Sequence, residues 1–452
     1  MGSFNKTRKG TGPRTFEGGP ASMLKPAEQL SRAVMTCLLW EDQYYIDGVA
    51  IADLVKSLMS KVSEEDAREI LNQAKWKNRL RHMPLYLMVL MAEKGWLKKE
   101  DVAGIITRPD DMTELLALYW KDGKKPLDHQ IVKGLAAAFP KFDEYQLAKY
   151  SRDKAVKLRD VIRIARPKPA NDEQSALWKR LVNNELETPD TWEVAISACG
   201  NDGAKKKAEF TRLLTEYKLG DLAFLRNLRK MLEVGVDEDV IRKSFENRKW
   251  GWIIPYQFIK AASYNPKIED AVEQAMIKSL SETEKITQKV ALLVDVSGSM
   301  NAELSAKSEV NRRDVAISLA ILLREICSNV KLYTFNNDSR NIPPRRGFAL
   351  RDYILKNFGG GTRMWHSIKQ AAAERENDVM IVITDEQTED HGNFDDANAG
   401  HLFIINVASY VNGVGYQKGV THINGWSDSC VSFIKEFLKK DADSANSENL
   451  SE

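Results

Sequence analysis

The stretch from Val290 to Met300, VALLVDVSGSM, constrains the fold of this chain more than any other part of it. Its first five residues are apolar, as in a strand that is buried on both faces of a parallel sheet. Asp295, Ser297 and Ser299 follow at every second position, so their side chains leave an extended segment from the same side. One carboxylate and two hydroxyls suit a hard cation. Open α/β sheets bind ligands at the carboxyl ends of their strands, which is where these side chains lie.

Two later stretches extend this pattern. FGGGT, residues 358–362, is a glycine-rich loop that ends in the hydroxyl of Thr362, and VMIVITD, residues 379–385, is a second buried-strand pattern that ends in Asp385. The ordered set resembles the metal-ion-dependent adhesion site of von Willebrand factor A domains. The resemblance implies that a divalent cation, Mg²⁺ by preference, is held by Asp295, Ser297, Ser299 and Thr362, with Asp385 acting largely through water.

The composition limits the function classes. A chain of 452 residues is too long for one ordinary core, so we expect two or three domains. The net charge is only +2, so a basic surface would have to be local. Four cysteines without metal spacing are typical of a cytoplasmic protein with reduced thiols. No apolar run is long enough to span a membrane, and no apolar segment follows the basic N-terminus, so we expect neither a membrane protein nor an adhesion receptor.

The chain divides into four parts. Residues 1–22 are predicted to be a flexible basic arm, and residues 441–452 an acidic, disordered tail. Residues 23–285 show helical periodicity with frequent Gly and Pro breaks and no clean repeat period, which favours an α-solenoid of HEAT type with divergent repeats. Strands and helices alternate over 286–440, which predicts a doubly wound, Rossmann-like α/β domain.

A helical solenoid followed by an A domain resembles the Ro autoantigen family, the TROVE-domain proteins that bind small RNAs. Five local stretches carry this resemblance, in the order in which the family has them. They are Asp42–Ile46, Met83–Leu90, Lys149–Pro169, Leu225–Met231 and Ile254–Phe258.

The resemblance implies a fold and a role. In the Ro family the solenoid closes into a ring that the A domain bridges, the hole accepts single-stranded ends of misfolded RNA, and the outer surface binds small non-coding Y RNAs. We therefore expect a cytoplasmic, monomeric protein of RNA quality control, with a nuclease or another protein as a possible partner of the A domain. One departure is Arg166, which stands where the family often has His.

Local charge supports RNA independently of the resemblance. The stretch 149–168 has eight basic and two acidic side chains, a net of +6 in 20 residues. Such a concentration in a near-neutral chain is typical of a phosphate-facing surface, although a solvated helix face is the alternative. Arg159, Arg163 and Arg166 recur at helical spacing and so share one face. The predicted RNA contacts here are Lys149, Arg152, Lys157, Arg159, Arg163, Arg166 and Lys168.

A second basic stretch, KWKNRLRH at residues 75–82, places an aromatic side chain between cations. This pattern suits single-stranded RNA through stacking and charge, although Trp76 fits a core position equally well. The predicted RNA contacts here are Lys75, Arg79, Arg81 and His82.

Rival interpretations remain open. The leading alternative is an intracellular scaffold for protein interactions whose metal site binds an acidic side chain of a partner. A metal-dependent hydrolase fits poorly, because no general base or second metal cluster accompanies the site and no catalytic motif is present. We therefore do not expect an enzyme. Glu386, which follows Asp385, is expected to face solvent.

Overall fold

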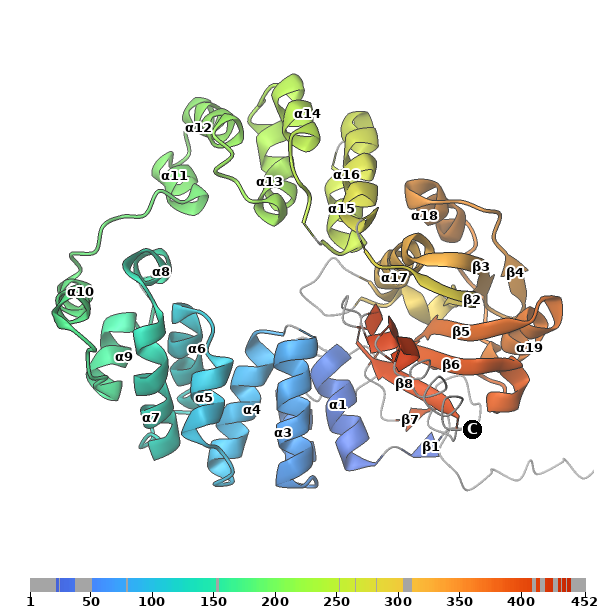
Figure 1. The fold of residues 1–452 in the computed structure, drawn as a ribbon, viewed down its shortest axis with the longest axis horizontal. Coiled ribbons are helices and arrows are strands. Elements are labelled where there is room, and N and C mark those ends of the chain that lie inside the picture. The colour runs from blue at the N-terminus through green and yellow to red at the C-terminus, as the bar shows by residue number, and fades with distance from the viewer. Residues whose placement is uncertain are drawn as a thin grey trace, which may run out of the picture. The chain divides into compact units, whose positions relative to one another are not determined.

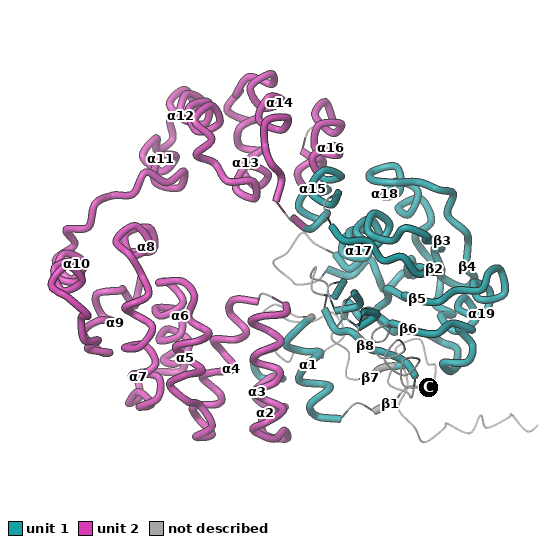
Figure 2. The backbone as a smooth tube through the Cα atoms, viewed as in Figure 1, with its two compact units in different colours: residues 1–54, 254–259, 276–452 teal, residues 55–253, 260–275 magenta. Residues whose placement is uncertain are grey.

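The computed structural model describes most of the chain and divides it into two compact units (Figures 1 and 2). Unit 1 comprises residues 1–54, 254–259 and 276–452, and unit 2 comprises 55–253 and 260–275. The described residues are 22–23, 25–36, 51–78, 80–151, 154–251, 253–264, 266–281, 283–303, 311–408, 412–414, 419–425, 430–431, 433–435 and 437–439.

Unit 2 is a stack of short α-helices. Helices two apart in the chain lie against each other, as α4 does with α6, α5 with α7, α6 with α8 and α7 with α9. Alternate helices therefore form two layers, which is the arrangement of a helical solenoid. Gly134 permits the closest of these approaches, since a Cβ there would lie 2.3 Å from Cβ of Val102. The predicted solenoid is confirmed, while its closure into a ring stays a prediction.

Several helices of this series begin at residues with clear N-cap signals in the sequence. Ser63 opens α3 as the N-cap of a capping box, with its side chain accepting a hydrogen bond from the backbone of Asp66 at 3.1 Å. The helices are α2 (Ile51–Met59), α3 (Glu64–Asn72), α4 (His82–Glu93), α5 (Lys99–Ile105), α6 (Pro109–Tyr119), α7 (His129–Ala138), α8 (Glu144–Tyr150), α9 (Leu158–Ala165), α10 (Asp172–Asn183), α11 (Trp192–Ala198), α12 (Gly203–Thr215), α13 (Asp221–Glu233), α14 (Glu238–Glu246), α15 (Pro255–Ala262) and α16 (Glu269–Ser281).

Unit 1 is built on a six-stranded sheet in the order β4-β3-β2-β5-β6-β8. All neighbours pair in parallel except β4, which is antiparallel to β3 at one edge. The order reverses between β2 and β5, as in Rossmann-like folds, and this confirms the predicted α/β architecture. The strands are β2 (Ile286–Asp295), β3 (Cys327–Phe335), β4 (Ser339–Asn341), β5 (Asn377–Thr384), β6 (Ala399–Asn406) and β8 (Val420–Asn424).

Helices cover both faces of this sheet, which explains why its central strands are apolar throughout. Helix α19 (Met364–Glu374) packs Trp365 and Ile368 into one core with Ala291 and Leu293 of β2. Helix α17 (Arg312–Ile326) packs on β2, β3 and β5. Helix α18 (Gly347–Leu355) contacts α17.

Helix α1 (Pro26–Thr36) belongs to unit 1 although it lies near the start of the chain. It packs against β8, and the short strand β1 (Ser22–Met23) pairs with β7 (Asn412–Gly413). The sequence pattern placed these residues with the solenoid. The rest of the expected arm and the acidic tail, 441–452, lie outside the described residues.

No helix in the described part of the chain is both long and apolar enough to cross a bilayer.

Candidate functional site

The first three predicted metal ligands lie where the strand order reverses. Asp295 is the last residue of β2. Strand β5 lies beside it, since Val294 of β2 pairs with Ile383 of β5. Ser297 and Ser299 lie in the turn that follows, and their Oγ atoms are 3.1 Å apart. All three side chains are buried. The expected convergence of one carboxylate and two hydroxyls is therefore present in the structure.

Both carboxylate oxygens of Asp295 are fixed by hydrogen bonds. The backbone N–H of Ser297 donates to Oδ1 at 2.9 Å, and the hydroxyl of Thr384 donates to Oδ2 at 2.6 Å. Burial and the nearby Asp385 together raise the pKa of Asp295 to about 7. A cation bound beside Asp295 would stabilise the ionised form of this buried carboxylate.

The glycine-rich loop brings Thr362 to the same place. Gly359 and Gly360 adopt positive φ angles of 126° and 92°, a region that favours glycine. Their backbone groups hydrogen-bond to the turn after β2, from Gly359 N–H to Val296 O at 2.8 Å and from Gly298 N–H to Gly360 O at 3.1 Å. This exchange of backbone hydrogen bonds holds the two loops together at the strand ends.

Thr362 gives the clearest indication that the site binds a ligand. Its hydroxyl oxygen is buried and has no hydrogen-bond partner among the described residues. A buried polar atom without a partner is costly, and a bound cation or its water would satisfy it. The donor set of hydroxyl and carboxylate oxygens fits Mg²⁺ or a similar hard cation. In the described part of the chain, no cluster of three or more His, Cys, Asp and Glu side chains offers a different kind of metal site.

Asp385 has a cationic partner that the sequence pattern did not reveal. Nη1 of Arg312 lies 3.0 Å from Oδ2 of Asp385 and 3.5 Å from the backbone oxygen of Ser299. Arg312 is 2% exposed and begins α17. Its position 73 residues before Asp385 gave no local signal of a pair.

Glu386 is buried, so the expectation that it faces solvent is wrong. Its side chain forms an ion pair with Arg32 of α1, and its Oε1 lies 2.8 Å from Nε2 of His422 in β8. Burial alone would raise the pKa of Glu386, but the charge of Arg32 and the contact with His422 outweigh burial and lower it to about 2. Arg32 also donates to Asn424 at 3.3 Å. This buried cluster attaches α1 to the loop that carries Asp385.

The basic face of α9 is exposed to solvent in unit 2. Arg159 and Arg163 lie four residues apart in α9, so they share a face, and Arg163 is exposed. Arg166 follows the helix as its C-cap in a left-handed conformation, with φ 48°, rather than continuing the helix. Among the described residues these three arginines and Lys168 have no carboxylate partner within 4 Å. Asp160 instead accepts from the backbone N–H of Lys157 at 3.0 Å, which leaves the cations of this face uncompensated.

The stretch 75–82 begins inside a π-helical turn, Gln73–Lys77, and Trp76 in this turn is exposed to solvent. Trp76 is 56% exposed, which excludes the core position that the sequence left open. Arg81, by contrast, contacts Asp110 at 2.5 Å and Asp111 at 3.2 Å. Burial lowers the pKa of His82, so its ring is neutral near pH 7. Lys75 has a side chain only 9% exposed that lies 3.9 Å from Asp111, so the part of this stretch available to a ligand is the exposed indole with Lys77.

The two basic stretches meet at the start of α6. Arg108 contacts Asp110, which also binds Arg81, and the guanidinium of Arg108 lies 4.5 Å from the ring centre of Tyr150. Lys154 forms an ion pair with Glu114 of α6. Lys75 lies 2.9 Å from Thr107 Oγ1, and Lys149 lies 5.9 Å from the ring centre of Tyr145. Arg79 and Arg152 lie outside the described residues.

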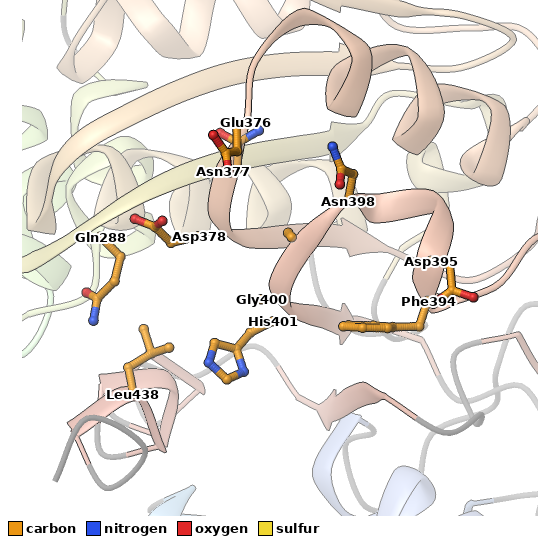
Figure 3. A pocket seen from close by; sticks show the side chains of 11 residues that line it. Gln288, Glu376, Asn377, Asp378, Phe394, Asp395, Asn398, Gly400, His401 and Leu438 are labelled. Atoms are coloured by element: carbon orange, nitrogen blue, oxygen red, sulfur yellow. The ribbon is translucent and has the colours of Figure 1, made fainter. Parts of the chain in front are cut away.

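A separate pocket of about 650 Å³ lies at the opposite end of the strands, where they begin (Figure 3). Its lining includes Gln288, Asn377 and Gly400, which lie near the starts of β2, β5 and β6. Parallel strands all begin on one side of the sheet and all end on the other. Asp295 lies where the strands end, so this pocket is not part of the Asp295 site.

The fold and the strand-end site together define a class of protein in which a helical solenoid unit accompanies an A-type α/β unit with a hydroxyl-rich site. Among solved structures, the fold is similar to that in the crystal structure of the Ro (RSR) protein of Deinococcus radiodurans, with a TM-score of 0.59 and 18% identity, covering 89% of this chain and 97% of that one. This chain thus has a Ro-like fold. No protein-family model and no curated protein matches the sequence.

Proposed function

We propose that this chain is an RNA-binding protein of Ro type that acts in RNA quality control. The observation that carries the proposal is the set of cations on and after α9, which have no carboxylate partners among the described residues although the whole chain is nearly neutral. Phosphate contacts from such side chains release condensed counterions and dominate affinity for nucleic acids. The Ro-like fold supports the same function.

Two kinds of RNA contact are expected in unit 2. Arg159, Arg163, Arg166 and Lys168 would bind phosphates of a structured small non-coding RNA of the Y type. Trp76 would stack on an unpaired base of a single-stranded end, since an exposed indole beside lysines suits such stacking. The arrangement requires no catalytic step, and we propose a non-enzymatic, monomeric protein of the cytoplasm.

We also propose that the Asp295 site holds Mg²⁺. Asp295, Ser297, Ser299 and Thr362 would supply its oxygen ligands, with Asp385 nearby. When bound, the cation would supply an open coordination position for an acidic group of a partner, such as a nuclease or another protein. The chain's own residues hold the ligands in place, since Thr384 and the backbone of Ser297 orient the Asp295 carboxylate.

The test is RNA binding at several salt concentrations by wild type and a triple variant, Arg159→Glu, Arg163→Glu and Arg166→Glu. We expect wild-type affinity to fall steeply with salt and the variant to lose most of its affinity and of its salt slope, because each lost phosphate contact removes roughly 0.7 to 0.9 from that slope. The matched control reverses the charges of Lys205, Lys206 and Lys207 on α12, which changes the net charge equally.

Three outcomes would contradict the proposal. Wild-type binding that does not depend on salt would exclude phosphate contacts as its basis. Equal losses in the test and control variants would show that overall charge matters and the α9 face does not. Absence of RNA binding would favour the scaffold alternative, for which Asp295→Ala should abolish capture of an acidic partner. Under our proposal Asp295→Ala removes the cation and leaves RNA affinity intact.

A further inference from the structure

The ion pair between Arg312 and Asp385 lies inside the proposed metal site. The guanidinium of Arg312 reaches Asp385, which follows β5, at 3.0 Å, and the backbone oxygen of Ser299, in the turn after β2, at 3.5 Å. Both side chains of the pair are almost completely buried. Arg312 therefore contacts two of the three loops that supply predicted ligands, the turn after β2 and the segment after β5.

This arginine occupies an electrostatically unfavourable position unless it pairs with Asp385. It is the first residue of α17, where the helix dipole disfavours a cation. Burial of its charge would be costly without an anionic partner. The neighbouring Glu386 is already neutralised by Arg32. Among the described residues, Arg312 is the one cation that contacts either Asp295 or Asp385.

We propose that Arg312 is a resident counter-charge that lowers the affinity of this site for its cation. The inference rests on the proposed metal site and adds a residue that the ligand pattern does not contain. Two carboxylates alone would give the site a charge of −2, and Arg312 reduces it to −1. A divalent cation is attracted by Asp295 and Asp385 and repelled by Arg312, so the arginine keeps binding weak and readily reversible.

The experiment is Mn²⁺ binding measured by electron paramagnetic resonance at pH 8.0, above the pKa of about 7 of Asp295. We expect Arg312→Met to bind Mn²⁺ about tenfold more tightly or better, because a full positive charge is removed from a buried site. Arg312→Lys keeps the charge and should bind as wild type does. Equal or weaker binding by a folded Arg312→Met protein would overturn the inference.

If Arg312→Met does not fold, the comparison of Asp385→Asn with the double variant Asp385→Asn, Arg312→Met tests the same inference. Asp385→Asn leaves Arg312 opposed only by Asp295, and we expect binding at least about tenfold weaker than wild type. Adding Arg312→Met restores a net charge of −1 and should recover most of that loss. Equal affinity of the single and double variants would overturn the role of Arg312. Absence of Mn²⁺ binding by wild type would refute the metal site itself, while RNA binding tests unit 2 separately.

Discussion

Replacing Glu386 by Gln should loosen the attachment of α1 to the sheet unit. Glu386 and Arg32 are 0% and 1% exposed, and the variant removes the carboxylate that pairs with the buried guanidinium. The pKa of Glu386 is about 2 against an ordinary value of 4.5. A difference of about 2.5 units corresponds to roughly 3 kcal/mol of stability at neutral pH, similar to the cost of breaking a buried pair elsewhere.

The sign of the pH dependence follows from the direction of this shift. A lowered carboxyl pKa stabilises the folded state fully above the unfolded value of about 4.5. That contribution disappears as the pH falls from about 4.5 to about 2, because in this range the unfolded chain binds a proton at Glu386 and the folded protein does not. Wild type should lose this contribution over that range, whereas Glu386→Gln should lack it at every pH.

The assay is urea unfolding combined with hydrogen exchange of peptides from α1 and β8. A loss of about 3 kcal/mol should lower the urea midpoint of unit 1 by about 1 to 3 M. Exchange in α1 should accelerate most, since Arg32 lies there. The matched control is Glu284→Gln, which removes an exposed pair with Lys439 and should leave the midpoint unchanged. An unchanged midpoint and unchanged α1 exchange in Glu386→Gln would refute the reasoning.

Three further outcomes are expected. Cation binding at the Asp295 site should weaken up to about tenfold per unit as the pH falls below about 7, because the cation must displace a proton; pH-independent Mn²⁺ titrations would contradict this. Gly134→Ala should destabilise unit 2 by about 1 to 3 kcal/mol in thermal unfolding through its clash with Val102, while Gly104→Ala, which meets no atom within 4 Å, should not. Ser63→Ala should cost about 1 kcal/mol by loss of the N-cap of α3, and Ser63→Asp should restore it.

Much of the architecture could be predicted from local pattern. The apolar runs of β2 and β5 identified the central strands of the sheet, and helical periodicity identified the solenoid. Five helices were not predicted individually, namely α2, α5, α12, α16 and α18. Of these, α12 contains the lysines at 205–207 and α16 ends where the charged stretch 281–289 begins, and these stretches resemble a polar turn and a linker. In both helices, burial of a few apolar side chains against neighbouring helices decides the structure.

The candidate sites were predicted less completely. Spacing within one strand end placed Asp295, Ser297 and Ser299 together, because alternation in an extended segment is a local property. Arg312 and Arg32 could not be found in this way, since their partners lie 73 and 354 residues away in sequence. The exposure of Trp76 depends on a π-helical turn for which the sequence carried no signal.

The segmented composition of unit 1 has a consequence for the synthesis of the protein. Helix α1 leaves the ribosome among the first residues, but β8, against which it packs, is among the last structured segments to emerge. While the intervening solenoid is translated, Arg32 and the apolar side of α1 cannot yet contact β8 and Glu386. Such exposed surfaces bind chaperones or misassemble. For the same reason, a fragment that starts at residue 286 would carry Glu386 without Arg32, so a recombinant A-type unit should be designed to include residues 22–36.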